Sequence, residues 1–366
     1  MNKKRFDYLD AAKGIGILLT VLGHVGFDGD RMLFFIFSFH MPLFFIVSGM
    51  LSATGPKRAF KETLKRKALS LIVPYAIFSV LGIVIYFVMN GLNFFSKDGL
   101  TMLRSMAFES VTLKGLFVLW FFPVMFFAGL LLEGVAKKLN GYVNLTLCVI
   151  AVIVLTLFGR KAELFLQGNY DTAWKCALIN LGLVAVRTVI ALVFMIAGFY
   201  FGRFVSQKGI VEKVSGTAYK KAFSVIGGLV LWGILFFTSW ENGSVDFASI
   251  HFSNGVVYFF NAFLGTAGCL MISVGLTGLK PLLWAGRNSV GIMVSHLNFY
   301  FMYFAELTAY KVSQIVFGVT DKNSFTDLNR LVCIATAFLV ATGLSVAFTF
   351  VTVRYLPWIY GRKRAN

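Results

Sequence analysis

The chain has 366 residues, of which 58% are hydrophobic and only 14% are charged. Soluble domains carry about 25% charged residues, so this composition excludes a soluble globular protein, as well as the disordered, collagenous and disulfide-rich classes. The net charge of +18 would suit a nucleic-acid-binding protein, but the basic residues lie in short loops between apolar segments, where they set membrane topology. We therefore expect a polytopic membrane protein without a nucleic-acid partner.

Ten segments are apolar over about 20 residues, the length that a helix needs to cross a bilayer core about 30 Å thick. All must be helical, because lipid offers the backbone no hydrogen-bond partners, and the predicted fold class is all-α. A very short polar turn around Asp28–Arg31 predicts a tight hairpin between the first two spans. In chain order the spans cover residues 11–27, 32–53, 68–90, 115–135, 143–159, 177–202, 221–239, 256–278, 289–309 and 331–355.

The loops between these spans differ in charge. With the N-terminus in the cytosol, cytosolic segments hold 22 of the 34 Lys and Arg residues, and most acidic residues fall on the other side. The positive-inside rule then places both termini in the cytosol. No loop is long enough for a second folded domain, so we expect residues 1–366 to form a single transmembrane domain, without a fused extracytoplasmic domain.

Ionisable residues inside spans are costly and are candidates for function. Lys13 and His24 are eleven residues apart on the first span, which is about 16 Å along a helix and nearly the same face. Asp10 lies one turn before Lys13 and can pair with it. Taken singly, each residue has a structural interpretation. Lys13 could anchor the helix by extending its ammonium to the membrane surface, and His24 could form a hydrogen bond between two helices. Together they indicate the two ends of a site that crosses the membrane.

Two further histidines lie in predicted spans. His40 should approach the depth of His24, and a histidine pair in one cavity can exchange protons near neutral pH. His296 lies in the ninth span, after an N-cap predicted at Asn288 and Ser289. A metal site is not expected, because neither an intramembrane carboxylate nor a third histidine at matching depth is evident, and the four cysteines form no CxxC pair. Pro42 and Pro74 are expected to kink their spans.

Other basic residues leave two interpretations open. Arg187 lies ten residues inside a span and requires an anion or a carbonyl partner. The cluster GPKRAFKETLKRKALSLIVPY contains Lys65, Arg66 and Lys67. It can serve topology alone, or it can clamp the phosphates of a polyanionic cytosolic ligand.

At these residues the sequence resembles the membrane-bound acyltransferase family 3, in particular its branch of fucose 4-O-acetylase-like and sugar O-acetyltransferases. The family's Arg/Lys-x10-His pattern is met by Lys13 and His24. The other similar motifs are RFDYLDAAKGIGILLTVLGH at 5–24, FHMPLFFIVSG at 39–49, the basic stretch ending in VPY at 75, LWFFP at 119–123 and GRNSVGIMVSH at 286–296.

The resemblance implies transfer of an acetyl or similar short acyl group from acetyl-CoA to a hydroxyl of an extracytoplasmic or lipid-linked glycan. It implies that His24 is catalytic, with His40 beside it, and that Lys65, Arg66 and Lys67 belong to the family's basic motif, here rich in lysine. We expect these three residues, Lys13 and Arg187 to bind the donor. The predicted supporting residues are Asp10, Ser48, Trp120, Asn288 and His296.

We expect the protein in a bacterial plasma membrane, surrounded by membrane lipid, with a homodimer as one option for its assembly. Direct transfer is favoured over an acyl-histidine intermediate. The alternatives are a transporter or flippase for a lipid-linked saccharide, which repeat symmetry or discontinuous helices would favour, and a structural or sensor subunit of an envelope complex.

Overall fold

The computed structural model describes residues 6–26, 30–56, 58–166, 172–319, 321 and 324–362. Helices make up 82% of it, and one two-stranded sheet is present in these ranges, which confirms the all-α fold class. Positions 28 and 29 of the turn predicted around Asp28–Arg31 lie outside the described residues, as do the termini at 1–5 and 363–366.

Seven helical segments of the described chain are long and apolar enough to cross a membrane. Three predicted spans are not among them, because their helices are shorter than expected. The span predicted at 115–135 begins as a helix only at Phe121, the span at 11–27 ends its helix at Leu22, and the span at 289–309 is interrupted. The total of ten spans and the cytosolic termini therefore stay predictions. The seven segments are Arg31–Thr54, Phe60–Met89, Gly141–Gly159, Ala173–Lys208, Ala218–Asn242, Gly255–Gly275 and Asp327–Tyr355.

The contacts among residues divide the chain into two compact units, each built from separate stretches of sequence. Unit 1 comprises residues 1–43, 214–244 and 261–356, and the boundary with unit 2 falls within three helices, α3 (His40–Thr54), α10 (Ile210–Ser215) and α12 (Gly255–Gly275). The other helices of unit 1 are α1 (Asp7–Leu22), α2 (Asp30–Phe37), α11 (Ala218–Asn242), α13 (Lys280–Arg287), α14 (Ser289–Asn298), α15 (Phe301–Phe317) and α16 (Asp327–Tyr355).

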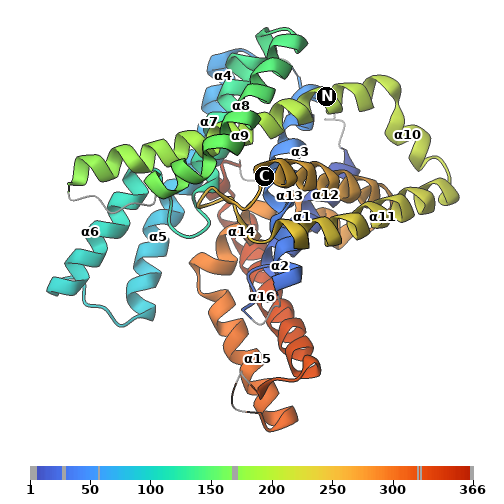
Figure 1. The fold of residues 1–366 in the computed structure, drawn as a ribbon. Coiled ribbons are helices and arrows are strands. Elements are labelled where there is room, and N and C mark those ends of the chain that lie inside the picture. The colour runs from blue at the N-terminus through green and yellow to red at the C-terminus, as the bar shows by residue number, and fades with distance from the viewer. Residues whose placement is uncertain are drawn as a thin grey trace. The chain divides into compact units, whose positions relative to one another are not determined.

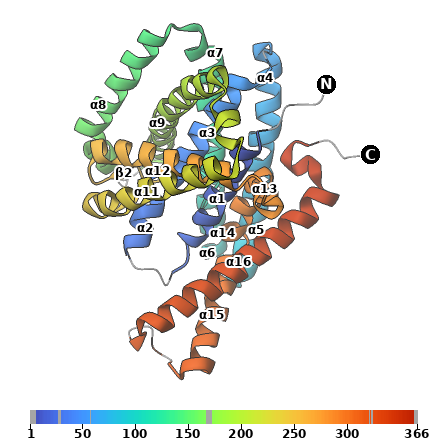
Figure 2. The ribbon, with the colours of Figure 1, turned by 90° about the vertical axis from the view of Figure 1, so that its right-hand side faces the viewer.

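In unit 1, α1 crosses α13 closely and also contacts α14 and α16, and α15 lies side by side with α16 (Figures 1 and 2). Two glycines allow the α1–α13 crossing. A side chain on Gly286 would overlap the carbonyl oxygen of Asp10, and one on Gly14 would overlap that of Leu282. The backbones can approach this closely only where no Cβ intervenes.

The ninth predicted span is broken into α14 and α15 at Phe299 and Tyr300. Tyr300 has a left-handed backbone (φ 59°), which a bulky residue adopts rarely. The chain changes direction there, so α15 does not continue the axis of α14. Residues 292–309, on both sides of the break, contain neither Pro nor Gly, so the sequence gave no signal of this interruption.

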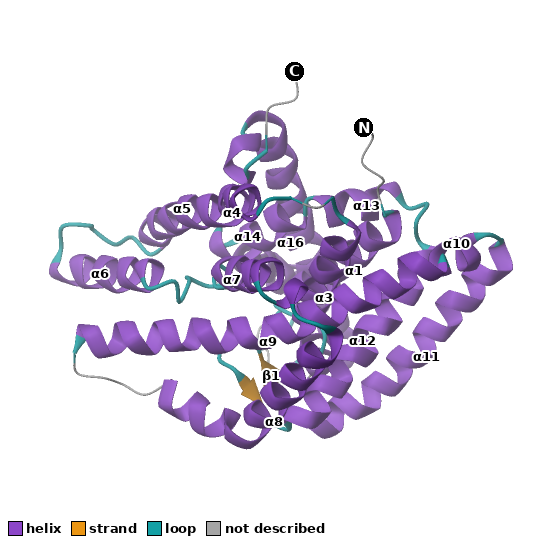
Figure 3. Cartoon of the chain, turned by 90° about the horizontal axis from the view of Figure 1, so that it is seen from above, coloured by secondary structure: helices purple, strands orange, loops and turns teal. Residues whose placement is uncertain are grey.

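Unit 2 comprises residues 44–213, 245–260 and 357–366. Here α7 packs on α9, and α5 lies beside α6 (Figure 3). Before Pro74 the chain widens into a π-helical turn, η1, the kind of irregularity that accompanies a missing backbone donor. The elements of unit 2 are α4 (Phe60–Lys67), η1 (Ala68–Ile72), α5 (Val73–Met89), α6 (Lys97–Val111), α7 (Phe121–Gly134), η2 (Ala136–Lys138), α8 (Gly141–Leu166), α9 (Ala173–Lys208), β1 (Val245–Asp246), β2 (His251–Phe252) and η4 (Pro357–Tyr360).

Candidate active site

His24 lies just beyond the C-terminal end of α1 and not within a continuous helix from Lys13. The helix ends at Leu22, and the backbone continues in tighter turns in which the His24 amide donates to the Val21 carbonyl. The predicted helical register between Lys13 and His24 therefore holds only as far as Leu22. The imidazole still bonds to the backbone one turn earlier, because Nδ1 of His24 lies 2.7 Å from the Thr20 carbonyl oxygen.

Three histidines of unit 1 form a cluster in which Phe37 lies between His24 and His40, and His296 contacts His24. The rings of His24 and His296 have centroids 5.1 Å apart, and the ring of Phe37 lies 5.7 Å from His24 and 5.0 Å from His40. His40 and His296 are buried, and His24 is half-buried. The sequence placed His24 and His40 together, as found, but it did not foresee that His296 would be the third member.

The three rings are held in the same way. In each, Nδ1 faces the carbonyl oxygen four residues earlier: Thr20 for His24, Ile36 for His40 at 3.0 Å and Ile292 for His296 at 3.3 Å. A carbonyl only accepts, so Nδ1 carries the proton, and Nε2 of a neutral ring is then the nitrogen that can take one up. The backbone thus sets the tautomer that a general base requires.

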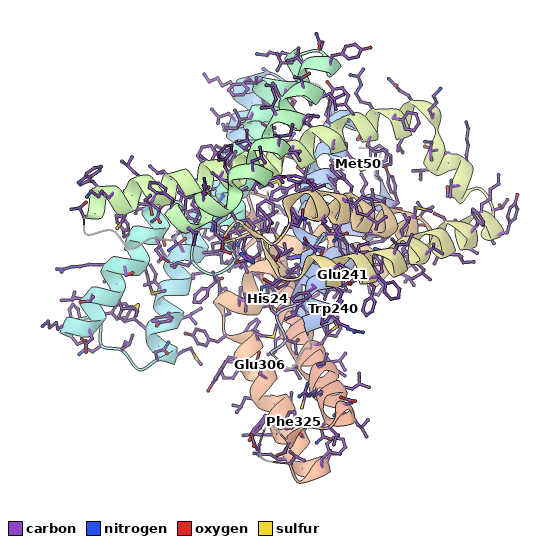
Figure 4. The ribbon with its side chains drawn as sticks, in the orientation of Figure 1. His24, Met50, Trp240, Glu241, Glu306 and Phe325 are labelled. Atoms are coloured by element: carbon purple, nitrogen blue, oxygen red, sulfur yellow. The ribbon has the colours of Figure 1, made fainter. Side chains whose placement is uncertain are left out.

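A carboxylate also lies near His24. The Oε1 atom of Glu306, on α15, accepts a hydrogen bond of 3.1 Å from the backbone amide of Gly26 (Figure 4). This bond ties the segment after His24 to α15. Glu306 falls within the ninth predicted span, and His296 lies beside His24, so a carboxylate and a third histidine that were not expected near this position are both present. The rule that charged residues in spans deserve scrutiny would have identified the carboxylate.

Lys13 belongs to an ion network at the other end of α1. Its Nζ atom lies 2.8 Å from Asp10, which confirms the predicted pair. Arg287 of α13 donates to Asp10 at 2.8 Å and to Asp7 at 2.9 Å. The hydrogen bond to Asp10 raises the pKa of Arg287 above its usual value, so the guanidinium stays charged. Because an ammonium has three donors, Lys13 retains capacity for another anion.

The basic residues of α4 divide between two environments in unit 2. Lys65 and Arg66 are exposed, whereas Lys67 is half-buried and extends to Gly129 of α7. Near Lys67, Glu133 is held by Lys137 at 2.8 Å and by the hydroxyl of Ser52. Of the three predicted donor-binding residues on α4, two are therefore available to a soluble ligand.

Arg187 is buried in unit 2 and has the carbonyl partners that the sequence left as one alternative. It donates to the carbonyl oxygens of Lys114, at 3.1 Å, and Ala248. Its guanidinium lies 5.2 Å from the ring centre of Trp120, and that ring stacks on Phe247. Arg187 and Trp120 thus join two loops, and a role for Arg187 in donor binding stays a prediction.

The remaining predicted residues have mainly local contacts. Ser48 is half-buried in α3, next to Gly49, which approaches the backbone of α9 closely. Asn288 precedes α14, as predicted, but its side chain does not cap that helix and donates instead to the Trp284 carbonyl at 2.9 Å. Within the described ranges, no group of three His, Cys, Asp or Glu side chains is arranged to hold a metal ion.

The family of the chain follows from its similarity to a known protein family. Neither the curated proteins nor the solved structures contain a match to this chain. The sequence model of the acyltransferase domain family matches residues 6–354, which covers nearly the whole chain and includes the histidines, Lys13 and α4. The chain therefore belongs to acyltransferase family 3 and is a multi-pass membrane protein.

Proposed function

We propose that the protein transfers an acetyl or similar short acyl group from cytosolic acyl-CoA to a hydroxyl of an extracytoplasmic or lipid-linked glycan in a bacterial plasma membrane. The observation that carries the proposal is the cluster of His24, His40 and His296, with each Nδ1 occupied by a backbone carbonyl. The family match supports the reaction type. The donor and the acceptor are inferred from the chemistry of the site and from the family resemblance.

In this proposal His24 is the general base. Its Nε2 takes the proton of the acceptor hydroxyl while the hydroxyl oxygen attacks the thioester carbonyl, and a C–O bond forms. The tetrahedral intermediate collapses with cleavage of the C–S bond, and the leaving thiolate takes the proton back from the imidazolium. A thioester is already activated, so a base and stabilisation of the oxyanion suffice.

The other site residues have supporting roles. Lys65 and Arg66, exposed on α4, and Lys13 at the cytosolic end of α1 supply cations for the phosphates of the donor. His296 contacts His24, and His40 lies across Phe37 from it; both are suited to relay a proton or orient the acceptor. Asp10 positions Lys13 through their 2.8 Å ion pair.

The test uses inside-out membrane vesicles from cells that produce the protein, supplied with acetyl-CoA labelled in its acetyl group. Label should appear in the glycan fraction, and His24→Ala should reduce its rate of appearance by about 10²–10⁴-fold, the usual effect of losing a general base. The control is His251→Ala, because His251 belongs to unit 2 and pairs with Glu163. Near-normal transfer by His24→Ala would make the histidine structural.

One observation favours a second candidate, a flippase for a lipid-linked saccharide. The break between α14 and α15 is a discontinuous helix, a feature common at the substrate sites of transporters. The same vesicles separate the two candidates, because a flippase moves the saccharide without consuming acetyl-CoA. Movement of the saccharide with no release of CoA would favour the flippase.

A further inference from the structure

A large apolar groove lies in unit 1, away from the histidines. It is formed by α1, α11, α13, α16 and the turn after α12, and its volume is about 1040 Å³, at the upper end of the range for small-molecule sites. Thr342 is the one polar residue among its lining side chains. An apolar cavity of this kind gives water few hydrogen-bond partners. The groove is therefore suited to a ligand with a hydrocarbon chain.

The groove is separate from the proposed active site. It is lined by Ile15, Leu18 and Leu19 on α1. With 3.6 residues per turn, these three positions lie on the side of α1 opposite Lys13 and Thr20, whose carbonyl holds His24. A ligand in the groove therefore does not reach the histidines around α1, and the groove needs an occupant of its own.

One end of the groove is basic. Lys280 lies between the lining residues Leu279 and Pro281 and is exposed. Arg354 is exposed one turn beyond Phe350 on α16. The backbone of Lys221 on α11 lies 3.6 Å from where a side chain on Gly275 would begin, next to the lining residue Leu276.

No acidic residue stands beside these cations in the sequence. The sequence contains no Asp or Glu at 218–223, 276–286 or 350–356. In the predicted orientation this end is cytosolic. Basic pockets between membrane helices on that side suit anionic lipid headgroups.

We propose that the groove binds an anionic phospholipid, with an acyl chain along α1 and α16 and the phosphate at Lys280, near Arg354 and Lys221. The apolar lining accounts for the chain, and the basic end selects the headgroup. This site is independent of the proposed catalysis, so its failure would leave the assignment of His24 unchanged.

The groove can be filled by mutation without a clash. A Cβ atom added to Gly343 would find no group of another element within 4 Å, and Gly343 lines the groove. Gly343→Phe should therefore fold and occupy the space of the acyl chain, and Ala347→Phe, which also lines the groove one turn later, should do the same. Gly233→Phe is the matched control, because Gly233 on α11 also faces open space but does not line the groove.

The experiment is native mass spectrometry of the full chain with phosphatidylglycerol and phosphatidylcholine of identical acyl chains. We expect one bound lipid and roughly fivefold more phosphatidylglycerol, from the attraction of one basic side chain. Lys280→Ala should remove the preference but keep binding, and Gly343→Phe and Ala347→Phe should remove both adducts. The Gly233→Phe variant should behave like the unmodified protein, and glycerol phosphate without a chain should not bind.

Several results would overturn the proposal. Equal binding of the two lipids would show that the basic end does not select the headgroup. An undiminished adduct in both groove-filling variants would show that the lipid binds elsewhere. A change from dimer to monomer in Gly343→Phe, with lipid binding unaltered, would show that a second copy covers the groove. Melting curves of each variant show that it is folded before binding is compared.

Discussion

The imidazoles of His24, His40 and His296 share one constraint, a bond from Nδ1 to the carbonyl four residues earlier. Each ring should therefore carry its proton on Nδ1 when it is neutral. Nitrogen-15 NMR of histidine-labelled protein in micelles distinguishes the two tautomers by the shift of Nε2. Signals of the Nε2–H form for these three residues would contradict the assignment of Nε2 as the accepting nitrogen.

The buried Arg187 side chain should contribute to stability through its two hydrogen bonds to backbone carbonyls. The change Arg187→Met leaves the half-buried carbonyls of Lys114 and Ala248 without their donor, at a cost of up to about 1–3 kcal/mol for each acceptor. The melting temperature in detergent should fall markedly. Arg203→Met is the control, because Arg203 is exposed on the same helix and surface changes usually stay within about 0.5 kcal/mol. An unchanged melting temperature for Arg187→Met would mean that the two loops do not depend on Arg187.

The sequence predicted contacts between side chains well where the two residues belong to the same helix or loop. The pairing of Lys13 with Asp10 follows from their spacing of three residues and is confirmed. By contrast, Arg287, Glu306 and His296 reach α1 and its end from more than 250 residues away. Spacing in one chain carries no information on such contacts, so they became visible only in the fold.

At the scale of elements, the crossing of α1 and α13 gives a direct test. Gly286→Ala would place a methyl group against the carbonyl oxygen of Asp10. The helices would have to separate, which we expect to cost about 1–3 kcal/mol and to lengthen the Arg287–Asp10 contact. Thermal unfolding should show the loss for Gly286→Ala and not for Gly278→Ala, where the added methyl group meets nothing. Equal melting of the two variants would exclude a tight crossing.

Hydropathy predicted which stretches are helical more reliably than where each helix ends. Apolar runs predicted the positions of the long helices α8, α9, α11 and α16, although α8 ends seven residues beyond its predicted span and α9 six. They did not show that α1 ends at Leu22 or that Tyr300 interrupts the ninth span. Helix ends depend on side-chain packing and on backbone angles at a few residues, and these leave no trace in average hydropathy.

For the whole molecule, orientation in the membrane is the outstanding prediction. The distribution of 22 of the 34 basic residues places position 61 in the cytosol and position 246 outside. Both Lys61 and Asp246 are exposed, so single cysteines there should react with a membrane-impermeant thiol reagent. In intact cells the Asp246→Cys variant should be labelled and the Lys61→Cys variant only after permeabilisation. The reverse pattern would invert the topology.

The ion pairs from Arg287 to Asp10 and Asp7 join residues 277 and 280 positions apart, and this has a consequence for biosynthesis. A ribosome adds about 5–20 residues per second, so Arg287 emerges roughly 14–56 s after Asp7. His296 follows later still. Throughout that interval the first helix is made and inserted without the partners that hold both its ends. The histidine cluster is thus completed late in synthesis, and slow translation before residue 287 would prolong the time during which the nascent chain offers an unfinished first helix to membrane proteases.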